Sequence, residues 1–369
     1  IARPAPALYG QFDNLDDIDF VVQGLYDMGF DDVFEVAKAA EMVSGYTRQY
    51  LRSENIPKPV ISSACPVIVR LISMRFPLLC KNILPILPPV EVAGKFAREK
   101  ALCEHPELSD SDIGCFFISP CPAKVSYVKN SFSGTKSNVD AVLSVSDVYF
   151  ELVSAMNKIK VPEKSTEAGC VGVSWATAGG ESTAVFNERY LAADGIENVI
   201  RVLDQIENSD FPELEFVELN ACNGGCVGGV MTVANPYIAK ARIHSLRRYL
   251  PVSPNYHPSD GEMDGGVVMP DVESIPQTPL SDDRAEAVRM MSDIQEIRKD
   301  LPDLDCGSCG APTCAAFAED IVRGEASADD CVVFMRHVFH DYIKRHVQQS
   351  RIAEEKTADG ENERRKADT

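Results

Sequence analysis

The sequence predicts an α/β fold with a mainly parallel sheet. Three apolar runs have the composition of buried strands: KPVISSACP at 58–66, IGCFFISPCPAK at 113–124 and LEFVELNACNGG at 214–225. Segments with helical spacing separate these runs, and strands that alternate with helices are typical of parallel sheets. Each run breaks into a turn that carries cysteine, and ligands of such sheets bind where the strands end. We therefore expect the three turns to converge on one site.

Helical patterns account for most of the remaining chain. Residues 15–51 have helical apolar spacing, interrupted at MGFDDVFEV, where the chain is expected to pass from a helix into a strand. Further helices are predicted near 142–158 and over 197–208. Between 252 and 280 the chain becomes rich in Pro, Gly, Ser and Asp, which is typical of a linker or a long surface loop. A short helix, a cysteine-rich segment and a long helix with a polar, frayed end are expected to follow.

Composition and charge exclude several classes of function. The chain of 369 residues carries a formal net charge of −20, which argues against nucleic acid or an anionic membrane as a partner. No apolar run reaches the roughly 18 residues that a membrane helix needs. The opening IARPAPALYG has no signal peptide and no Met. We therefore expect a cytoplasmic protein and a missing upstream part.

Twelve cysteines are many for an acidic chain without an export signal. In a reducing compartment, cysteines are more often metal ligands or catalytic groups than disulfides. Eight of them fall into two sets. The other four stand apart and are expected to be small buried side chains: Cys80, Cys103, Cys115 and Cys170.

The C-terminal set has the spacing C-x2-C-x4-C-x16-C, formed by Cys306, Cys309, Cys314 and Cys331. One loop supplies three thiolates at close spacing, and a distant fourth closes the cage, as in iron–sulfur proteins. Zinc also takes four thiolates and is the alternative. The pattern favours a 4Fe–4S cluster.

The second set is dispersed and consists of Cys65, Cys121, Cys222 and Cys226. Lys124 follows Cys121 by three residues, and a lysine beside a thiolate-bound cluster can donate to an anionic group. A surface position for Lys124 is the alternative. Four glycines surround Cys222 and Cys226 and are expected to let the backbone approach a bulky ligand closely.

The stretches ISSACP, ISPCPAK and ELNACNGGCVGG resemble, in the same order, the three motifs of the iron-only (FeFe) hydrogenases: TSCCP, MPCxxKxxE and ExMACxxGCxxGG. The similarity extends over nearly all of residues 1–250, where ARPAPALYG resembles the family's opening strand. AGGES at 178–182 resembles the family's glycine turn before a helix.

The resemblance implies two lobes of mainly parallel sheet, flanked by helices, with the H-cluster between them. The H-cluster is a 4Fe–4S cubane joined through one cysteine to a di-iron unit that carries CO, CN and a bridging dithiolate amine. By position, Cys65, Cys121 and Cys222 would hold the cubane together with Cys226, which would be the bridge. Lys124 would donate to a cyanide, and Pro120 would line the same pocket.

Several positions differ from the family motifs. The proton-relay cysteine is replaced by Ala64, and the two relay glutamates fall on Ser44 and Thr47, which do not titrate near neutral pH. The relay serine falls near Leu84. The ordinary proton route is therefore expected to be missing while the four cubane ligands are kept.

Three pocket positions differ as well. Ser119 and Asn220 replace the methionines of the second and third motifs, and Tyr127 replaces the glutamate after the lysine. A more polar pocket is expected to alter the potential of the di-iron unit. Such losses resemble the sensory hydrogenases, which react slowly with hydrogen and also carry a C-terminal cluster domain.

The sequence thus leaves two hypotheses. The first is a slow or sensory FeFe hydrogenase that interconverts H2 and protons and relays electrons through a C-terminal 4Fe–4S cluster. The alternative is a cluster-only, hydrogenase-like protein of iron–sulfur assembly or electron transfer. Expected partners are H2, protons, maturation proteins and an electron carrier or downstream signalling partner, and a dimer is compatible with the sequence. The expected domains are 1–251 for the H-cluster, 252–300 for a linker and short helix, 301–345 for the 4Fe–4S domain and 346–369 for the tail.

Overall fold

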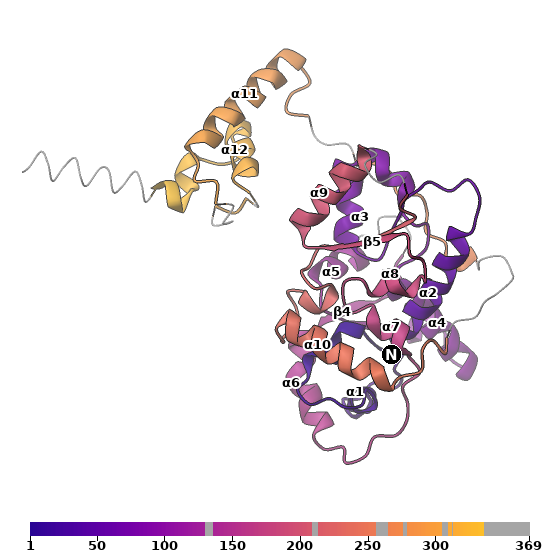
Figure 1. Ribbon diagram of the computed structural model, residues 1–369. Coiled ribbons are helices and arrows are strands. Elements are labelled where there is room, and N and C mark those ends of the chain that lie inside the picture. Colours follow the sequence, from indigo (N-terminus) through magenta and orange to yellow (C-terminus); the bar gives the residue numbers. More distant parts are fainter. Residues whose placement is uncertain are drawn as a thin grey trace, which may run out of the picture. The chain divides into compact units, whose positions relative to one another are not determined.

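The computed structural model describes residues 1–129, 136–208, 213–255, 265–275, 279–304, 309–311 and 313–335 (Figure 1). The chain forms two compact units, Ile1–Pro276 and Gln277–Thr369. Cys306 and most of the predicted C-terminal helix lie outside the described residues. None of the helices in the described part is long and apolar enough to cross a membrane.

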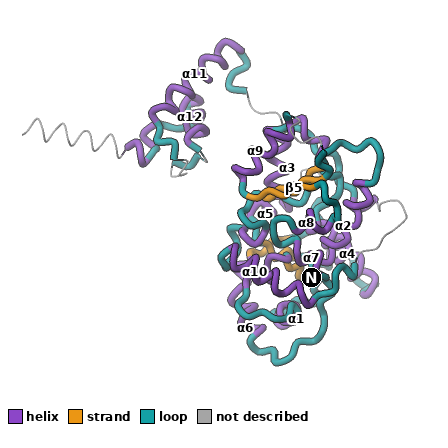
Figure 2. Tube along the Cα trace, in the orientation of Figure 1, coloured by secondary structure: helices purple, strands orange, loops and turns teal. Residues whose placement is uncertain are grey.

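Two separate parallel sheets form the centre of the first unit, and Figure 2 shows their short strands in orange. One sheet has the order β1–β3–β4 and the other β2–β6–β5. The first sheet consists of β1 (Ala2–Pro4), β3 (Phe116–Ser119) and β4 (Ala141–Ser144), and the second of β2 (Val60–Ile61), β6 (Phe216–Asn220) and β5 (Tyr190–Asp194). The predicted α/β fold with two lobes of parallel sheet is therefore confirmed.

Helices cover these sheets. A proline is the first residue of four of them, at a position where a missing N–H costs nothing. The helices of the first unit are α1 (Asp19–Asp27), α2 (Val36–Leu51), α3 (Pro66–Arg75), α4 (Pro89–Glu104), α5 (Pro122–Lys129), α6 (Val145–Met156), α7 (Cys170–Ser174), α8 (Gly180–Ala184), α9 (Ile196–Glu207) and α10 (Pro236–Leu246).

Alternation along the central strands decides which helices each sheet face contacts. Successive side chains of a strand point to opposite faces. Ile118 packs with α1 and α6, whereas its neighbour Phe117 packs with α2 and α4. On β6, Val217 packs with α3 and α9. Burying each such side chain stabilises the fold by about 1.5–3 kcal/mol.

The strand predicted within KPVISSACP is shorter than its apolar run, because only Val60 and Ile61 pair with β6. The sequence reasoning did not predict β4 or β5. The side chains of β5 are mostly half-buried or exposed, so it lacks the continuous apolar run of a buried strand.

Part of the predicted linker is packed into the first unit. Leu87 donates its backbone N–H to Val267, and Ile86 forms an antiparallel bridge with Val268. Val267 is fully buried in the core. The short apolar run GVVM was hidden by its Pro, Gly and Asp neighbours, so residues 265–275 belong to the first unit rather than to a free linker.

The second unit contains α11 (Arg284–Asp300) and α12 (Cys314–Arg323). The expected short helix is α11, which supplies Ile294 and Ile297 to one apolar cluster with Leu301 and Phe317. The helix predicted within 252–300 is thus part of the cysteine module. Of the predicted long C-terminal helix, residues 332–335 are described and are helical.

Candidate metal centre

The four dispersed cysteines all follow strands. Cys65 is the residue that precedes α3, just beyond β2, and Cys121 lies between β3 and α5. Cys222 follows β6, and Cys226 begins a short 3-10 helix, η4 (Cys226–Gly228). Because β3 and β6 are the central strands of the two sheets, the cysteines come from both lobes. This is the arrangement expected where strand ends form a site.

Cys121 and Cys226 line one cavity, and all four thiols are close enough to influence one another electrostatically. Burial, followed by the nearby Cys121 and Cys65, raises the pKa of the Cys222 thiol to about 11. The pKa of Cys226 is also raised, by burial and then by Cys65 and Cys121, while Lys124 opposes the shift. Cys226 is exposed and lines a cavity together with Cys121 and Lys124.

This donor set suits a metal cluster. Thiols with raised pKa values hold their protons, and binding of a cluster as thiolate ligands would release them. Among the described residues, no three His, Cys, Asp or Glu side chains come close enough together to hold a single metal ion. Four converging cysteine side chains are a donor set that an iron–sulfur cluster can use, as can zinc.

A cavity of about 80 Å³ opens beside Cys226. A water needs roughly 10–15 Å³ of such space, so the cavity has room for several small groups. Its walls are mostly apolar, with Lys124 as the one ionisable nitrogen. The lining residues are Ala5, Pro6, Val36, Ala40, Ala64, Pro89, Val90, Phe117, Ser119, Pro120, Cys121, Lys124, Trp175, Ala176 and Cys226.

Lys124 lies inside the site rather than on the open surface. It is half-buried on α5, and its Nζ donates to the backbone carbonyl oxygen of Ala64 at 2.9 Å. The same Nζ lies 5.5 Å from the centre of the Tyr127 ring. Lys124 therefore lines the cavity, and its ammonium group connects the second cysteine turn to the first.

Ser119 and Pro120 also line the cavity, whereas Asn220 does not. The Ser119 hydroxyl accepts the backbone N–H of Cys121 at 3.1 Å and so fixes the cysteine turn. The side-chain amide of Asn220 donates to Glu218 at 2.8 Å. The structure thus brings Ala64, Ser119 and Pro120 together but leaves Asn220 outside the cavity wall.

At the expected relay positions Ser44 and Thr47, the side-chain hydroxyl groups are engaged in hydrogen bonds. Ser44 lies fully buried on α2, accepts the indole N–H of Trp175 at 3.0 Å and donates to Ala40. Thr47, one turn later, donates to the backbone of Val43. Leu84 is buried in the apolar core. The hydroxyl groups of Ser44 and Thr47 do not titrate near neutral pH, and the Leu84 side chain has no polar group.

The glycines around Cys226 have a role that the sequence reasoning missed. A Cβ atom on Gly229 would lie 2.3 Å from the Pro120 carbonyl oxygen, and one on Gly228 would lie 2.0 Å from the Asn223 carbonyl oxygen. Gly225 has a φ of +89° and would meet Ala178. These glycines admit neighbouring backbone, which holds the cysteine loop against the second turn.

The sequence analysis did not predict a buried pair of carboxyl groups, Glu181 and Glu218, near the cavity. Glu181, on α8, is fully buried, and burial followed by the nearby Glu218 raises its pKa. Burial also raises the pKa of Glu218, although the backbone N–H groups of Gly179 and Ser182 oppose the shift. The only sequence signal was a glutamate at an inward position of an apolar strand, FVELN.

Hydrogen bonds connect this pair to the cavity. Ser62 donates its hydroxyl to Glu181 at 2.6 Å and accepts the backbone N–H of Ala64 at 3.1 Å. The second carboxyl oxygen of Glu181 is buried and has no hydrogen-bond partner among the described residues. A carboxyl group in that position is most stable when it keeps its proton. The structure therefore holds a titratable pair two hydrogen bonds from the backbone of Ala64.

Three of the four C-terminal cysteines share one apolar cluster. Cys314 begins α12, Cys331 is buried, and Cys309 is partly buried beside them. The backbone N–H of Phe334 points to the Cys331 sulfur at 3.5 Å. Cys306, the fourth, lies outside the described residues. The choice between iron–sulfur and zinc is not tested by this geometry.

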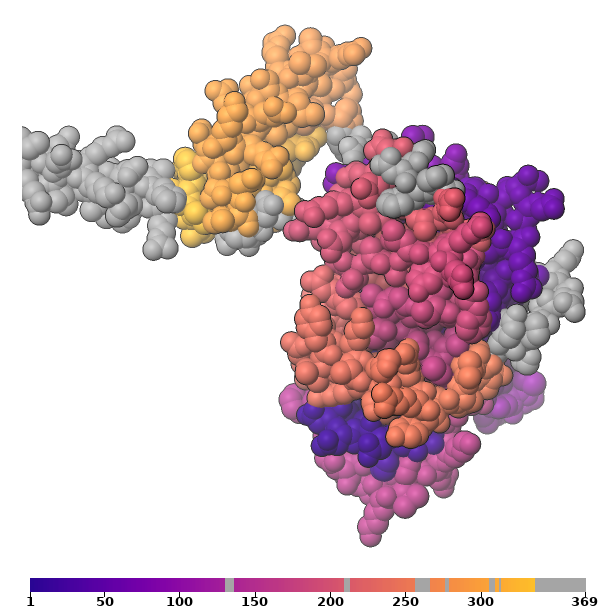
Figure 3. All heavy atoms as spheres, viewed as in Figure 1, coloured from indigo at the N-terminus to yellow at the C-terminus, as the bar shows by residue number. Residues whose placement is uncertain are grey.

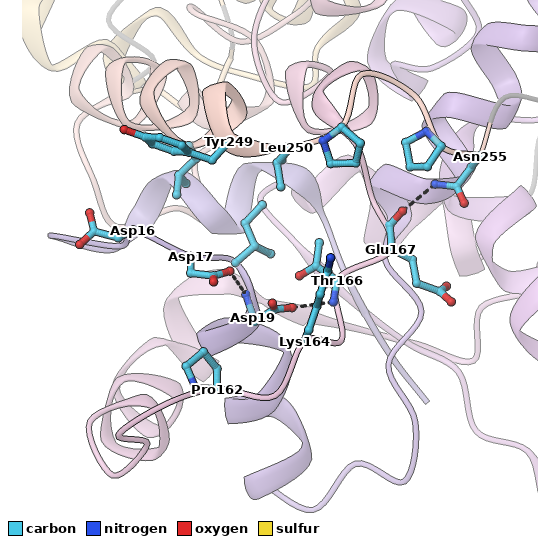
Figure 4. A pocket seen from close by; sticks show the side chains of 14 residues that line it. Asp16, Asp17, Asp19, Pro162, Lys164, Thr166, Glu167, Tyr249, Leu250 and Asn255 are labelled. Atoms are coloured by element: carbon cyan, nitrogen blue, oxygen red, sulfur yellow. Dashed lines mark hydrogen bonds between the residues drawn. The ribbon is translucent and has the colours of Figure 1, made fainter.

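A second hollow, of about 600 Å³, has different chemistry (Figure 4). Its Asp19 accepts the backbone N–H groups of Ser165 and Thr166, and Asn255 donates to the backbone carbonyl of Glu167. These polar groups hold the surrounding loops together. No described cysteine of either set lines this hollow.

The fold and the cysteine site together define an iron–sulfur protein. Comparison with known families places it more closely: residues 1–230 match the family described as "Iron only hydrogenase large subunit, C-terminal domain". The chain therefore belongs to the iron-only hydrogenase family. Residues 301–333 match a second family, described as "Putative Fe-S cluster".

Solved structures agree on the fold. An FeFe hydrogenase described in connection with oxygen inactivation of its H cluster has a TM-score of 0.56 at 14% identity, and the match covers 74% of this chain and 94% of that one. An apo FeFe hydrogenase from Chlamydomonas reinhardtii has a TM-score of 0.54 at 15% identity, with 74% and 93% covered. At these identities the likeness shows the H-cluster-domain fold alone.

Curated relatives match over short stretches. The corrinoid/iron-sulfur protein large subunit of Moorella thermoacetica is 56% identical over 36 residues, which is 10% of this chain and 8% of that protein. An uncharacterized protein of Methanocaldococcus jannaschii is 37% identical over 51 residues, or 14% and 23%. The chain thus spans less than a quarter of either relative.

Proposed function

We propose that this protein is a slow, sensory FeFe hydrogenase that interconverts hydrogen with protons and electrons at an H-cluster. The observation that carries the proposal is the cavity between Cys226 and Ala64, entered by Lys124. A protein that held only a cubane would need the four cysteines but not a cavity with a lysine beside them.

The residues fit the H-cluster on their chemistry. Cys65, Cys121, Cys222 and Cys226 would hold the cubane, with Cys226, which faces the cavity, as the bridge to the di-iron unit. The di-iron unit, when bound, supplies the site at which hydrogen is split. Lys124 would donate a charge-assisted hydrogen bond to an anionic ligand of that unit in place of the Ala64 carbonyl.

Slow turnover follows from what replaces the proton relay. The Ala64 methyl group cannot carry a proton, and Ser44 is locked between Trp175 and the α2 backbone. The buried Glu181 and Glu218 are titratable groups, and Ser62 links Glu181 to the backbone of Ala64 by hydrogen bonds. We propose that protons reach the cavity from Glu181 and Glu218. Between Ser62 and the cavity lies only the Ala64 backbone, which has no titratable group, and this break in the route limits the rate.

We propose that a second cluster, in residues 301–335, passes the redox state of the site to an electron carrier or a signalling partner. The protein would thus sense hydrogen without consuming much of it. Maturation proteins would supply the di-iron unit.

Infrared spectroscopy tests the proposal. After maturation with a synthetic or enzymatically made di-iron unit, the protein should show CO and CN bands that shift when hydrogen is added. A protein that binds cubane iron but never shows these bands under the same treatment would be the cluster-only relative instead. Stoichiometric zinc without iron would exclude both functions.

A further inference from the structure

The loop between Cys222 and Cys226 has a distinctive backbone. Gly224 and Gly225 follow one another with positive φ angles of +82° and +89°, a conformation that glycine adopts at little cost. Successive N–H groups in turns of this kind form a concavity that can receive an anion, and many iron–sulfur sites use one. The direction of each N–H in this loop therefore matters for a cluster held by the two cysteines.

Hydrogen bonds fix the backbone of the loop. The Gly224 carbonyl accepts the N–H of Ala178 at 3.0 Å, and the Gly225 N–H turns back to the Cys222 carbonyl at 3.1 Å. The Gly224 N–H donates instead to a side chain, the carboxylate of Asp194, at 2.5 Å. An N–H donor that lies between two cluster ligands is thus taken up by a carboxylate from another segment.

The sheet positions this carboxylate. Asp194 is the last residue of β5 and pairs in register with Asn220, the last residue of β6. The Gly195 N–H donates to the Asn220 carbonyl at 3.0 Å, and the side-chain amide of Asn198 donates to the Asp194 carbonyl at 3.1 Å. The position of Asp194 is therefore set by backbone outside the cysteine loop.

The turn after β5 also packs directly on the cysteine loop. A Cβ atom on Gly195 would lie 2.4 Å from the side-chain oxygen of Asn223, and Gly195 has a φ of +83°. A larger residue at this position would push the two segments apart. The two segments therefore meet at adjacent residues, Asp194 with Gly224 and Gly195 with Asn223.

Asp194 lies near the surface of the first unit. Figure 1 shows β5 and α9 on the outside of that unit, and the atoms of this segment are open to view in Figure 3. Asp194 is half-buried, and no Lys or Arg in the described part of the chain forms an ion pair with it. Its carboxylate therefore adds negative charge beside the loop, although nearby solvent screens part of that charge.

Both properties of Asp194 bear on how easily a cluster takes up an electron. The reduction potential of an iron–sulfur cluster depends on the net charge around it and on hydrogen bonds to its sulfurs. Asp194 takes an N–H that a cluster sulfur could otherwise accept, and it places a negative charge nearby. Each effect disfavours an added electron, so the two effects act in the same direction.

We propose that Asp194 is a positioning residue that keeps the reduction potential of the cubane low, because it holds the Gly224 N–H away from the cluster. The cubane then accepts an electron only under strongly reducing conditions. Asp194 would thereby set how much hydrogen is needed before the protein responds. That consequence rests on the proposed function, whereas the effect on the potential does not.

Redox titration tests the role of Asp194. The full chain is reconstituted anaerobically with iron and sulfide alone, in a Cys309→Ser background that removes the C-terminal cluster, and the EPR signal of the reduced cubane is followed against potential. Asp194→Ala should raise the reduced fraction about tenfold at a given potential, which corresponds to about 59 mV for one electron. Asp194→Asn keeps an uncharged, weaker acceptor and should raise the reduced fraction about threefold.

The matched controls are Asp204→Ala and Asp204→Asn, which make the same changes at an exposed position on α9. They should leave the potential unchanged, and equal shifts at both positions would mean that net charge alone is responsible. A potential that stays unchanged in both Asp194 variants, with or without a loss of thermal stability, would show that Asp194 only fastens the loop. If Asp194→Ala does not hold four irons, an unchanged potential in Asp194→Asn overturns the proposal by itself.

Hydrogen separates this inference from the proposed function. After maturation, Asp194→Asn should need less hydrogen than the wild type to reduce its cubane. Shifted potentials in a protein that never shows CO and CN bands would refute the proposed function and leave the role of Asp194 standing. Hydrogen-responsive bands together with unshifted potentials would do the reverse.

Discussion

At the scale of single residues, the proposed slow turnover depends on Ala64, which occupies the position expected for the relay cysteine. Its methyl group lies in the cavity wall, and its backbone atoms bond to Ser62 on one side and Lys124 on the other. A placed proton donor is typically worth about 10²–10⁴ in rate. In the proposed function, the absence of a proton donor at Ala64 is enough to account for slow turnover.

Restoring the relay should work only as a unit. We expect a small gain in hydrogen–deuterium exchange for Ala64→Cys alone and a larger, non-additive gain when Ser44→Glu and Thr47→Glu are added. Ser44 and Thr47 are buried, so carboxyl groups at these two positions will have raised pKa values and will lower the stability of the fold. Exchange and dye reduction are compared at equal di-iron loading and several pH values. Wild-type rates equal to those of fast family members would show that the protein has an efficient proton route, and the prediction would be wrong.

Lys124 allows a second test on one side chain. Lys124→Ala should leave the cubane in place but weaken retention of the di-iron unit, because a charge-assisted donor worth about 1.5–3 kcal/mol is lost. Lys129→Ala, at the exposed end of the same helix, is the control. Di-iron occupancy is measured from the CO and CN bands. Undiminished occupancy in Lys124→Ala would contradict the assigned role.

At the scale of elements, β6 and α8 together bury the carboxyl pair. Strand alternation places Val217 in the apolar core and turns Glu218 to the opposite face, toward the start of α8. Glycine at position 179, with φ +85°, lets the chain enter α8 sharply enough for Glu181 to face inward. The pair is thus a product of two elements far apart in sequence.

This pair should make stability depend on pH. The pKa values of Glu181 and Glu218 are raised above their ordinary value near 4.5. Between that value and the raised pKa, the folded state binds more protons than the unfolded state, so the free energy of unfolding falls as pH rises. Glu181→Gln should flatten this fall, by about 1.4 kcal/mol for each pH unit of the window. Denaturation at several pH values, with the exposed Glu188→Gln as control, measures it.

The same variant tests the proposed proton supply. With the cofactor loaded to the wild-type level, Glu181→Gln should lower hydrogen–deuterium exchange by about 10²-fold or more. Glu188→Gln should not change it. An unchanged rate in Glu181→Gln, together with the expected change in stability, would assign the pair a purely structural role.

At the scale of the whole molecule, two cysteine sites belong to two separate units. If both hold cubanes, anaerobically prepared protein should contain about eight irons, with about two more when the H-cluster is complete. Cys309→Ser should remove about four irons and leave the CO and CN bands unchanged, because the first unit does not depend on that ligand. Loss of the bands together with the four irons would show that the two sites are not independent.

The sequence by itself determined the fold class and the position of the cysteine-bearing turns along the chain. Cysteine spacing and order are local properties of the chain, and the apolar runs before Cys65, Cys121 and Cys222 were sufficient to place each turn at the end of a strand. The helices over 145–156 and 196–207 were also predictable, because amphipathic spacing is visible within a few turns.

Tertiary structure alone decided how the site is enclosed. That Lys124 bonds to Ala64, that Trp175 closes the route through Ser44, and that Asn220 turns away from the cavity all depend on contacts between distant segments. The burial of Glu181 and the packing of Val267 against the first unit also depend on such contacts. Burial and hydrogen-bond partners depend on which distant segments come into contact, and local patterns in a single sequence do not specify these contacts.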